Sequence, residues 1–440
     1  MPPERPAEDY PHSLVARERE KHVSARTVFR PYARLFDVPG SRTFSFAGWL
    51  ARLPMPILGL GTVLLVEGQS GSYALAGAVA GTLALVGSVS SPQWARAMDR
   101  RGQGAVLRCA FTGYLIFGTA FVAAVVLDAP LWAWFALAGA TGGCGPNVGS
   151  SVRARWAHAL DPERRQTAFA FESVVDEVVF VIGPPLVTLL ATLINPPIGF
   201  LTGVLIGFGG GMWLSRLRST EPPVHPPQPG ASAARSVLLV PTVLFVSTVY
   251  LAIGCVFGAM DVVVVGFADA QDAPALAGVA LAFFAGGSLV AGLVYGVARL
   301  PGSLASRYVG CAVFFGVALQ LVLTVGSLPV LIVVGFVAGL SIAPVLVSGT
   351  SLVESRVARS ALTEALTWIV TGLTLGVTVG SAVAGAAVDR WGAEAAFAVP
   401  ATAAALSAML ALAARPLLRR SGSAPRGVDV PVRVEDRSGG

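Results

Sequence analysis

Long apolar stretches alternate with short polar segments along most of this 440-residue chain. Most of these stretches hold about 20 or more predominantly apolar residues, enough at roughly 1.5 Å per residue for a helix to cross about 30 Å of hydrocarbon. The pattern therefore predicts an all-α membrane protein. Its twelve predicted spans lie at residues 44–66, 73–93, 109–127, 131–152, 167–191, 197–214, 243–267, 275–298, 308–326, 329–353, 362–388 and 395–414.

The composition agrees with a protein that crosses the lipid bilayer many times. The residues are 54% hydrophobic and 13% charged, and the mean hydropathy is +0.70. All four cysteines lie within predicted spans at no metal-ligand spacing, so we interpret them as packing residues. We expect no metal site and no cofactor.

The basic residues predict the orientation of the chain. Twelve crossings bring both termini to one face, and 29 of the 31 Lys and Arg residues lie there, including Arg153 and Arg155 in the loop after the fourth span. By the positive-inside rule this face is cytoplasmic. Arg390 lies on the other face, and Arg52 lies within the first span. The net charge of +6 is dispersed over short loops and does not indicate a nucleic-acid partner.

A proline-rich segment divides the spans into six and six, and its composition favours an extended linker. The polar segments at the two ends of the chain predict disorder. The predicted units are a cytoplasmic arm (1–43), a six-helix bundle (44–215), a cytoplasmic linker (216–236), a second six-helix bundle (237–416) and a disordered cytoplasmic tail (417–440).

A short motif follows the second span. It reads Ala95-Arg-Ala-Met-Asp99-Arg100-Arg-Gly102 and resembles the cytoplasmic Gly-x-x-x-Asp-Arg-x-Gly signature of the major facilitator superfamily, with Ala95 in place of the first glycine. The loop side, the twelve spans and the six-plus-six division agree with this family. The resemblance extends over about residues 44–416 and implies two six-helix bundles that work by alternating access around a central site.

The chain most closely resembles the bacterial exporters of this family. Gly183-Pro184-Pro185 in the fifth span is similar to the Gly-Pro element of the family's antiporter motif, although Val179 and Val187 replace the flanking glycines. This resemblance implies a location in the bacterial inner membrane. It also implies that Asp99, Arg100 and Gly102 form a gating loop that locks the cytoplasmic side closed.

Six ionisable residues lie inside the predicted spans, where each needs a partner or a water-filled cavity. Glu172 and Asp176 are four residues apart on one face of the fifth span, with Asp176 close to the midplane. Repulsion between two carboxylates and their removal from water both favour binding of a proton. Because every histidine lies outside the spans, Asp176 is the leading proton-coupling candidate, with Glu172 as its modulator. The alternative is that one of them pairs with Arg52 at a similar depth.

Several other residues are weaker candidates. Glu364 and Asp261 are further possible proton sites, although Glu364 is near a helix start and Asp261 near a helix end. The third acid of the fifth span, Glu177, points to another face. Gly145, Pro146, Gly183, Pro184 and Trp368 are candidates for flexible or cavity-lining positions, although close packing is the simpler interpretation of the glycines of the fourth span and of Trp368.

These features predict a secondary transporter and not an enzyme. We expect a monomer that exports a small amphipathic compound in exchange for protons. Proton-coupled uptake of a sugar or organic acid is the first alternative, and a non-transporting membrane receptor or scaffold is the second. No Walker motif is present, so ATP is not the expected energy source.

Overall fold

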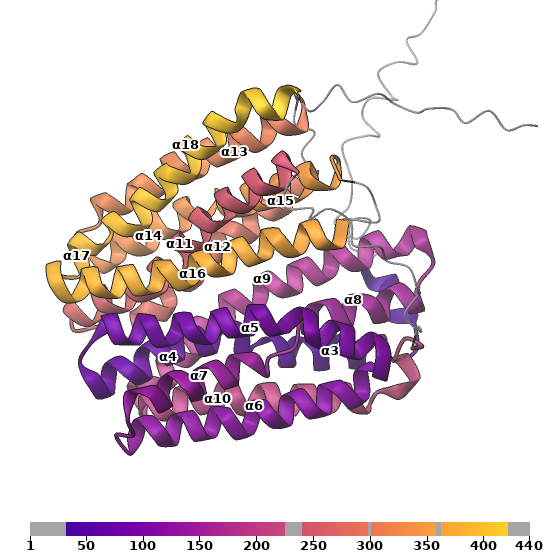
Figure 1. The fold of residues 1–440 in the computed structure, drawn as a ribbon, viewed down its shortest axis with the longest axis horizontal. Coiled ribbons are helices and arrows are strands. Elements are labelled where there is room, and N and C mark those ends of the chain that lie inside the picture. The colour runs from indigo at the N-terminus through magenta and orange to yellow at the C-terminus, as the bar shows by residue number, and fades with distance from the viewer. Residues whose placement is uncertain (1–31, 225–239, 298–300, 358–361, 421–440) are drawn as a thin grey trace, which may run out of the picture.

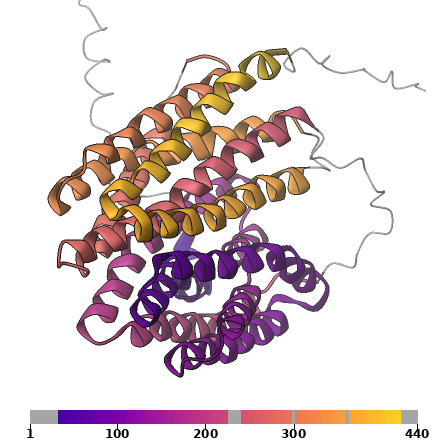
Figure 2. The same cartoon turned by 60° about the vertical axis from the view of Figure 1, so that its left-hand side comes forward.

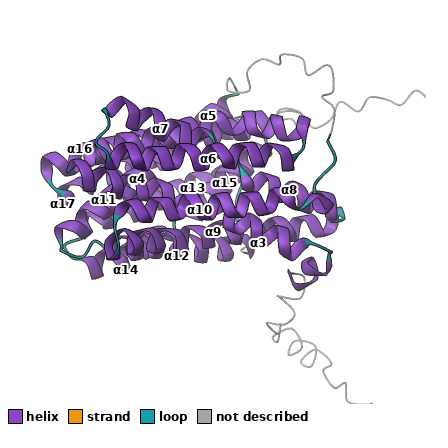
Figure 3. Ribbon diagram, turned by 90° about the horizontal axis from the view of Figure 1, so that it is seen from below, coloured by secondary structure: helices purple, strands orange, loops and turns teal. Residues whose placement is uncertain are grey.

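The computed structural model describes residues 32–224, 240–297, 301–357 and 362–420. Within these ranges all regular secondary structure is helical (Figure 3), which agrees with the predicted all-α class. Most of the predicted arm, linker and tail lies outside the described residues.

The first half of the chain begins with a short 3-10 helix, η1. Its elements are η1 (Arg34–Asp37), α3 (Ser41–Arg52), α4 (Pro54–Ser70), α5 (Tyr73–Arg101), α6 (Gln103–Val126), α7 (Leu131–Gly143), α8 (Val148–Ala159), α9 (Pro162–Leu193), α10 (Pro196–Arg216) and η2 (Arg218–Thr220).

The second half has the same general plan. Its elements are α11 (Pro241–Ala270), α12 (Leu276–Val297), α13 (Leu304–Ala318), η4 (Leu319–Thr324), α14 (Leu328–Gly339), α15 (Ile342–Glu354), α16 (Leu362–Trp391), α17 (Ala393–Ala396) and α18 (Ala398–Arg420). Figure 2 shows the two halves as neighbouring bundles, one indigo to magenta and the other pink to yellow.

Eleven helical segments among the described residues are long and apolar enough to cross a membrane. The fourth predicted stretch is not among them because it forms two shorter helices, α7 and α8, on either side of Cys144–Asn147. Pro146 lacks a backbone donor, and the Asn147 side chain accepts a hydrogen bond from the Ser150 amide at 3.0 Å, which starts a new helix. The two short helices together follow the path of the remaining span.

Successive spans alternate in direction, so the bundle has two ends. We call the end that contains the start of α3 and the end of α18 the terminal face, and the other end the opposite face (Figure 1, right and left). The predicted loop after the second span belongs to the terminal face, although α5 continues through Arg101 and includes Asp99. The structure also corrects the prediction that Arg153 and Arg155 lie in a loop, because both are within α8.

The two halves meet closely along α5 and α16, which lie side by side (Figure 1). A Cβ added at Gly77 of α5 would overlap the backbone of Ser381, and the Thr378 hydroxyl donates to the Gly81 carbonyl at 3.0 Å. These contacts extend from the opposite face to Gly81. Residues 82–97 of α5 are all partly or fully exposed in the protein alone, so the halves separate toward the terminal face.

Candidate functional site

A fully buried guanidinium joins the first and fifth spans. Arg52 ends α3 and has 1% of its surface exposed. Its Nη2 forms an ion pair with Glu172, and its Nη1 lies 2.8 Å from Asp176 Oδ1. The structure therefore brings together the three intramembrane residues that the sequence analysis placed at a similar depth. Each buried charge has a partner, which offsets part of the cost of removing it from water.

Glu172 is the most completely enclosed member of this group, with no exposed surface. Besides Arg52, it accepts a hydrogen bond from Trp156 Nε1 at 2.7 Å and from the Ser45 hydroxyl at 3.3 Å. The donors come from α3 and α8, so Glu172 ties both helices to α9. Three donors from three side chains hold this carboxylate in place.

Asp176 lies one turn further along α9 and is accessible. Its Oδ1 accepts from Arg52, and its Oδ2 lies 2.7 Å from Arg153 Nη2. Asp176 and Arg153 are 34% and 33% exposed, in contrast to the enclosed Arg52 and Glu172. A proton or a polar ligand can therefore reach Asp176 without disturbing the buried pair.

Two glycines allow the helices to bring these charges together. A Cβ at Gly48 of α3 would overlap the Val152 side chain of α8, so glycine permits the close approach of these helices. A Cβ at Gly149 would lie 3.2 Å from Arg153 Nη1 and 3.9 Å from Asp176 Oδ1. The absence of a side chain at Gly149 therefore leaves space beside the Arg153–Asp176 pair.

Sequence reasoning missed Arg153 because it placed this residue one position beyond the fourth span. The helix break before Asn147 starts α8 afresh, and Arg153 then lies in the second turn of that helix. A signal was available, because Arg153 and Trp156 are three residues apart and therefore share one side of a helix.

The other candidate acids lie outside this group of charges. Glu177 of α9 accepts a long hydrogen bond, 3.4 Å, from Ser288 of α12, so it contacts the second half. Asp261 lies within α11 and forms no hydrogen bond or ion pair with the described residues. Glu364 is exposed in the first turn of α16.

The remaining candidates occupy different surroundings. Gly145 and Pro146 lie in the break between α7 and α8. Gly183 lies in α9 against α4, where a Cβ would overlap the ring of Pro56. Pro184 follows it within the same helix and removes a backbone donor. Trp368 of α16 is partly buried against the core.

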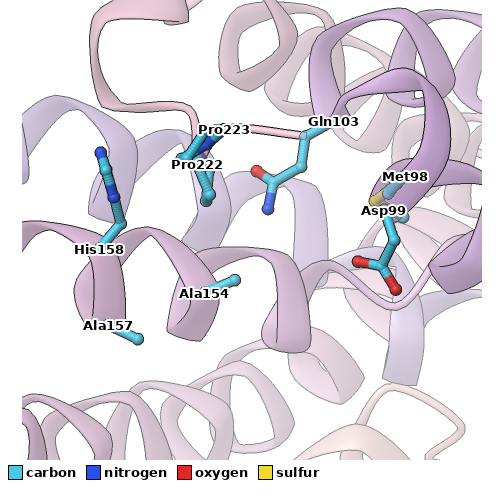
Figure 4. Close-up of a pocket in the computed structure, with 8 residues that line it drawn as sticks. All are labelled: Met98, Asp99, Gln103, Ala154, Ala157, His158, Pro222 and Pro223. Carbon is cyan, nitrogen blue, oxygen red and sulfur yellow. The ribbon is translucent and has the colours of Figure 1, made fainter. Parts of the chain in front are cut away.

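The signature segment lies beside a cavity of about 370 Å³ at the terminal face. Figure 4 shows Ala154, Ala157 and His158 on α8 along one side, with Asp99 and Gln103 on other elements around it. Asp99 and Arg100 are exposed and form no ion pair with the described residues. Within the described ranges the predicted gating pair therefore has no ionic partner in the second half.

Buried Arg155 connects this region to the rest of the first bundle. It donates to Gln103 Oε1 at 2.9 Å and to the carbonyls of Leu214 and Leu217 at 3.1 and 2.8 Å. These carbonyls lie at the end of α10, where helices have no internal donors left. Arg155 thus completes that helix end. No group of His, Cys, Asp and Glu side chains in the described ranges could hold a metal ion.

Three kinds of comparison place the chain among known proteins. The family model of the Major Facilitator Superfamily matches residues 44–300. No curated protein sequence matches the chain. Many solved structures share the fold. A peptide transporter POT in complex with sulfate has a TM-score of 0.66 at 14% identity, with 87% of this chain and 96% of that chain covered.

Two other structures extend the comparison. The nucleoside transporter NupG has a TM-score of 0.65 at 15% identity, covering 84% of this chain and 99% of that chain. The human organic anion transporter MFSD10 has a TM-score of 0.59 at 15% identity, covering 85% and 99%. At these identities the likeness concerns the fold, whereas the family model covers more than half of the sequence. The chain belongs to the Major Facilitator Superfamily and is a secondary transporter.

Proposed function

We propose that this transporter is coupled to protons through Asp176 and that it exports a small amphipathic compound. The observation that carries the proposal is the position of Asp176 between two guanidinium groups from different helices, with one third of its side chain exposed. A proton that reaches Asp176 removes its charge. The ion pair with Arg153 is then lost, while Glu172 continues to neutralise Arg52.

The consequence of protonation is mechanical. Arg153 belongs to α8 and Asp176 to α9, so loss of this pair loosens one contact between the fourth and fifth spans. The Glu172 bonds to Trp156 and Arg52 keep both helices attached during the change. A salt bridge that breaks on protonation is a two-state element, and it shifts the populations of two conformations by its difference in free energy.

The direction of transport rests on the fifth span. Gly183-Pro184-Pro185 resembles the antiporter element of the family, and two consecutive prolines interrupt the hydrogen-bond ladder of α9 there. Gly183 lets α9 and α4 approach closely at the same point, where a Cβ would overlap the ring of Pro56. The antiporter-like element supports exchange of substrate against protons. The excess of Lys and Arg on the side of the chain ends supports placing the terminal face in the cytoplasm, with the protein in a bacterial inner membrane.

Arg153 favours a second candidate function, proton-coupled uptake of an organic acid. Once Asp176 is protonated, the exposed guanidinium of Arg153 has lost its partner, and a substrate carboxylate could replace it. Proton and anion then bind together and cross in the same direction. The alternative of a non-transporting receptor or scaffold gains no support from the comparisons.

One experiment tests coupling and direction together. Everted membrane vesicles containing the full chain are energised, and a panel of labelled amphipathic cations, neutral compounds and organic acids is screened for gradient-driven movement. Export by antiport predicts accumulation inside everted vesicles that collapses when the pH gradient is removed. Asp176→Asn should abolish the accumulation, and Glu177→Gln, on another face of α9, should reduce it less. Uphill transport by Asp176→Asn at matched abundance would place proton coupling elsewhere.

The proposed orientation has its own test. Ser219 is exposed in η2 at the terminal face. A cysteine at this position, in a chain without its native cysteines, should react with a membrane-impermeant maleimide only after the inner membrane is opened. Labelling in intact cells would show that the terminal face lies outside the cytoplasm.

A further inference from the structure

The end of α16 carries a second copy of the family signature. Gly385-Ala-Ala-Val-Asp389-Arg390-Trp-Gly392 matches Gly-x-x-x-Asp-Arg-x-Gly at every specified position, including the first glycine that Ala95 replaces in the first copy. The first copy ends α5 at the terminal face. The second copy ends α16 at the opposite face.

The two copies also share a backbone geometry. Gly102 has φ 83° and ψ 151°, and Gly392 has φ 80° and ψ 162°. The amide of Gly102 donates to the Met98 carbonyl at 2.9 Å, and that of Gly392 donates to the Val388 carbonyl at 3.0 Å. Positive φ at both glycines turns the chain sharply into the following helix. Each signature therefore presents its aspartate just before the same kind of helix end.

Asp389 binds the start of α5 in the other half of the molecule. Its Oδ1 accepts from the Tyr73 amide at 2.9 Å, and its Oδ2 accepts from the Ala74 amide at 3.0 Å and the Ser72 hydroxyl at 2.8 Å. The Ser72 hydroxyl in turn accepts from the Leu75 amide at 3.2 Å. The second half thus supplies the partner for the first two free amides of α5.

This contact stabilises α5 in two ways. The first amides of a helix have no internal acceptors, and a carboxylate there also interacts favourably with the helix dipole. The first glycine of the same motif permits the approach, because a Cβ at Gly385 would overlap the Tyr73 carbonyl. The glycine and the aspartate of one motif therefore serve one contact between the halves.

We propose that Asp389 is a latch that holds the opposite face closed and must release α5 before that face opens. Separation of the halves there removes three hydrogen bonds from Asp389 and leaves two amides of α5 without their cap. The first signature stands at the other end of the same helix pair. Asp389 is bonded to α5 here, whereas Asp99 forms no ion pair with the described residues, so the proposal assigns the two signatures to alternate states.

Distance measurements between spin labels test the latch without any knowledge of the substrate. Labels are placed at Leu127, 77% exposed at the end of α6, and at Gln271, exposed at the end of α11, so that both halves are marked at the opposite face. The full chain, with its native cysteines replaced, is reconstituted in liposomes. Asp389→Ala should raise the ratio of molecules open at the opposite face to molecules closed there about tenfold, equivalent to about 1.4 kcal/mol.

Two further variants distinguish loss of the hydrogen bonds to α5 from loss of a negative charge at this face. Asp389→Asn retains one acceptor oxygen and should shift the ratio less than Asp389→Ala. Asp272→Asn removes the same charge at the same face from a residue at φ 55°, where asparagine is tolerated, and should leave the ratio unchanged. Folding is checked by a single symmetric peak in gel filtration. Unchanged distances in folded Asp389→Ala, or an equal shift in Asp272→Asn, would overturn the latch.

Discussion

The two halves of the molecule hold their corresponding helices together by different chemistry. In the first half, Arg52, Glu172 and Trp156 link α3, α9 and α8 through charge. In the second half, the Tyr250 hydroxyl of α11 donates to the Leu346 carbonyl of α15 and lies 3.3 Å from Thr350 Oγ1. One half thus uses charged groups for a contact that the other half makes with a neutral hydroxyl.

This difference indicates a division of labour. An ion pair that includes an accessible carboxylate changes when a proton binds, whereas a tyrosine bonded to a backbone carbonyl does not change near neutral pH. Under the proposed coupling through Asp176, the first half is therefore the part that responds to protons, and the second half is the part against which it moves.

The largest expected effect is loss of the buried cation. Arg52→Ala leaves Glu172 charged and enclosed, and breaking such a pair costs about 3–5 kcal/mol. We expect a large fall in the thermal unfolding midpoint in detergent. Asp261→Asn replaces a carboxyl group that forms no ion pair with the described residues by an amide of similar shape, and it should change stability by less than about 1 kcal/mol. A wild-type midpoint for Arg52→Ala would show that Glu172 does not depend on this cation.

A smaller effect is expected from filling space in the second half. A Cβ at Gly349 of α15 would lie 2.8 Å from the Tyr250 ring and 2.9 Å from the Tyr308 ring, so Gly349→Ala should cost about 1–3 kcal/mol. A change in α8, Gly149→Ala, brings the new Cβ no closer than 3.2 Å to any neighbour, the Arg153 Nη1 atom, and should cost less. Unfolding midpoints of the two variants give the comparison. The reverse order would mean that the first half is the more rigid one.

The broad plan of the fold could be predicted from the sequence, and the partners in the site only in part. Long apolar stretches must become helices in a membrane because every backbone group needs an internal partner. Depth and spacing placed Arg52, Glu172 and Asp176 together but left their pairing open. That pairing depends on how α3, α8 and α9 approach one another, and no local pattern specifies it.

Two features escaped the sequence reasoning for identifiable reasons. The fourth span was treated as one helix, although Pro146 and Asn147 form a stop and a cap, and this error moved Arg153 out of the site. The signature at Asp389 was overlooked because it lies on the less basic face, away from the loop in which the family motif was expected. Its role depends on contact with α5, more than 300 residues away in the sequence.

Substitution of Asp99 should shift the conformational equilibrium in the direction opposite to substitution of Asp389. If the first signature closes the terminal face, Asp99→Asn should lower the population closed on that side, by about tenfold or about 1.4 kcal/mol. The spin labels at Leu127 and Gln271 should then report fewer molecules that are open at the opposite face. Asp389→Ala should give more such molecules. Combining the two variants should return the ratio toward that of the wild type. Shifts in the same direction would show that the two signatures do not alternate.

The smallest expected effect separates two tyrosines of the second half. Tyr250→Phe removes the hydrogen bond to the Leu346 carbonyl and should lower stability by about 1 kcal/mol. Tyr308 is 1% exposed, and its hydroxyl has no hydrogen-bond partner among the described residues. Because an unpartnered buried hydroxyl is unfavourable, Tyr308→Phe should leave the unfolding midpoint unchanged or raise it slightly. A fall in stability for Tyr308→Phe as large as that for Tyr250→Phe would mean that the Tyr308 hydroxyl binds water or another partner in the membrane, and the second half would then hold a polar site of its own.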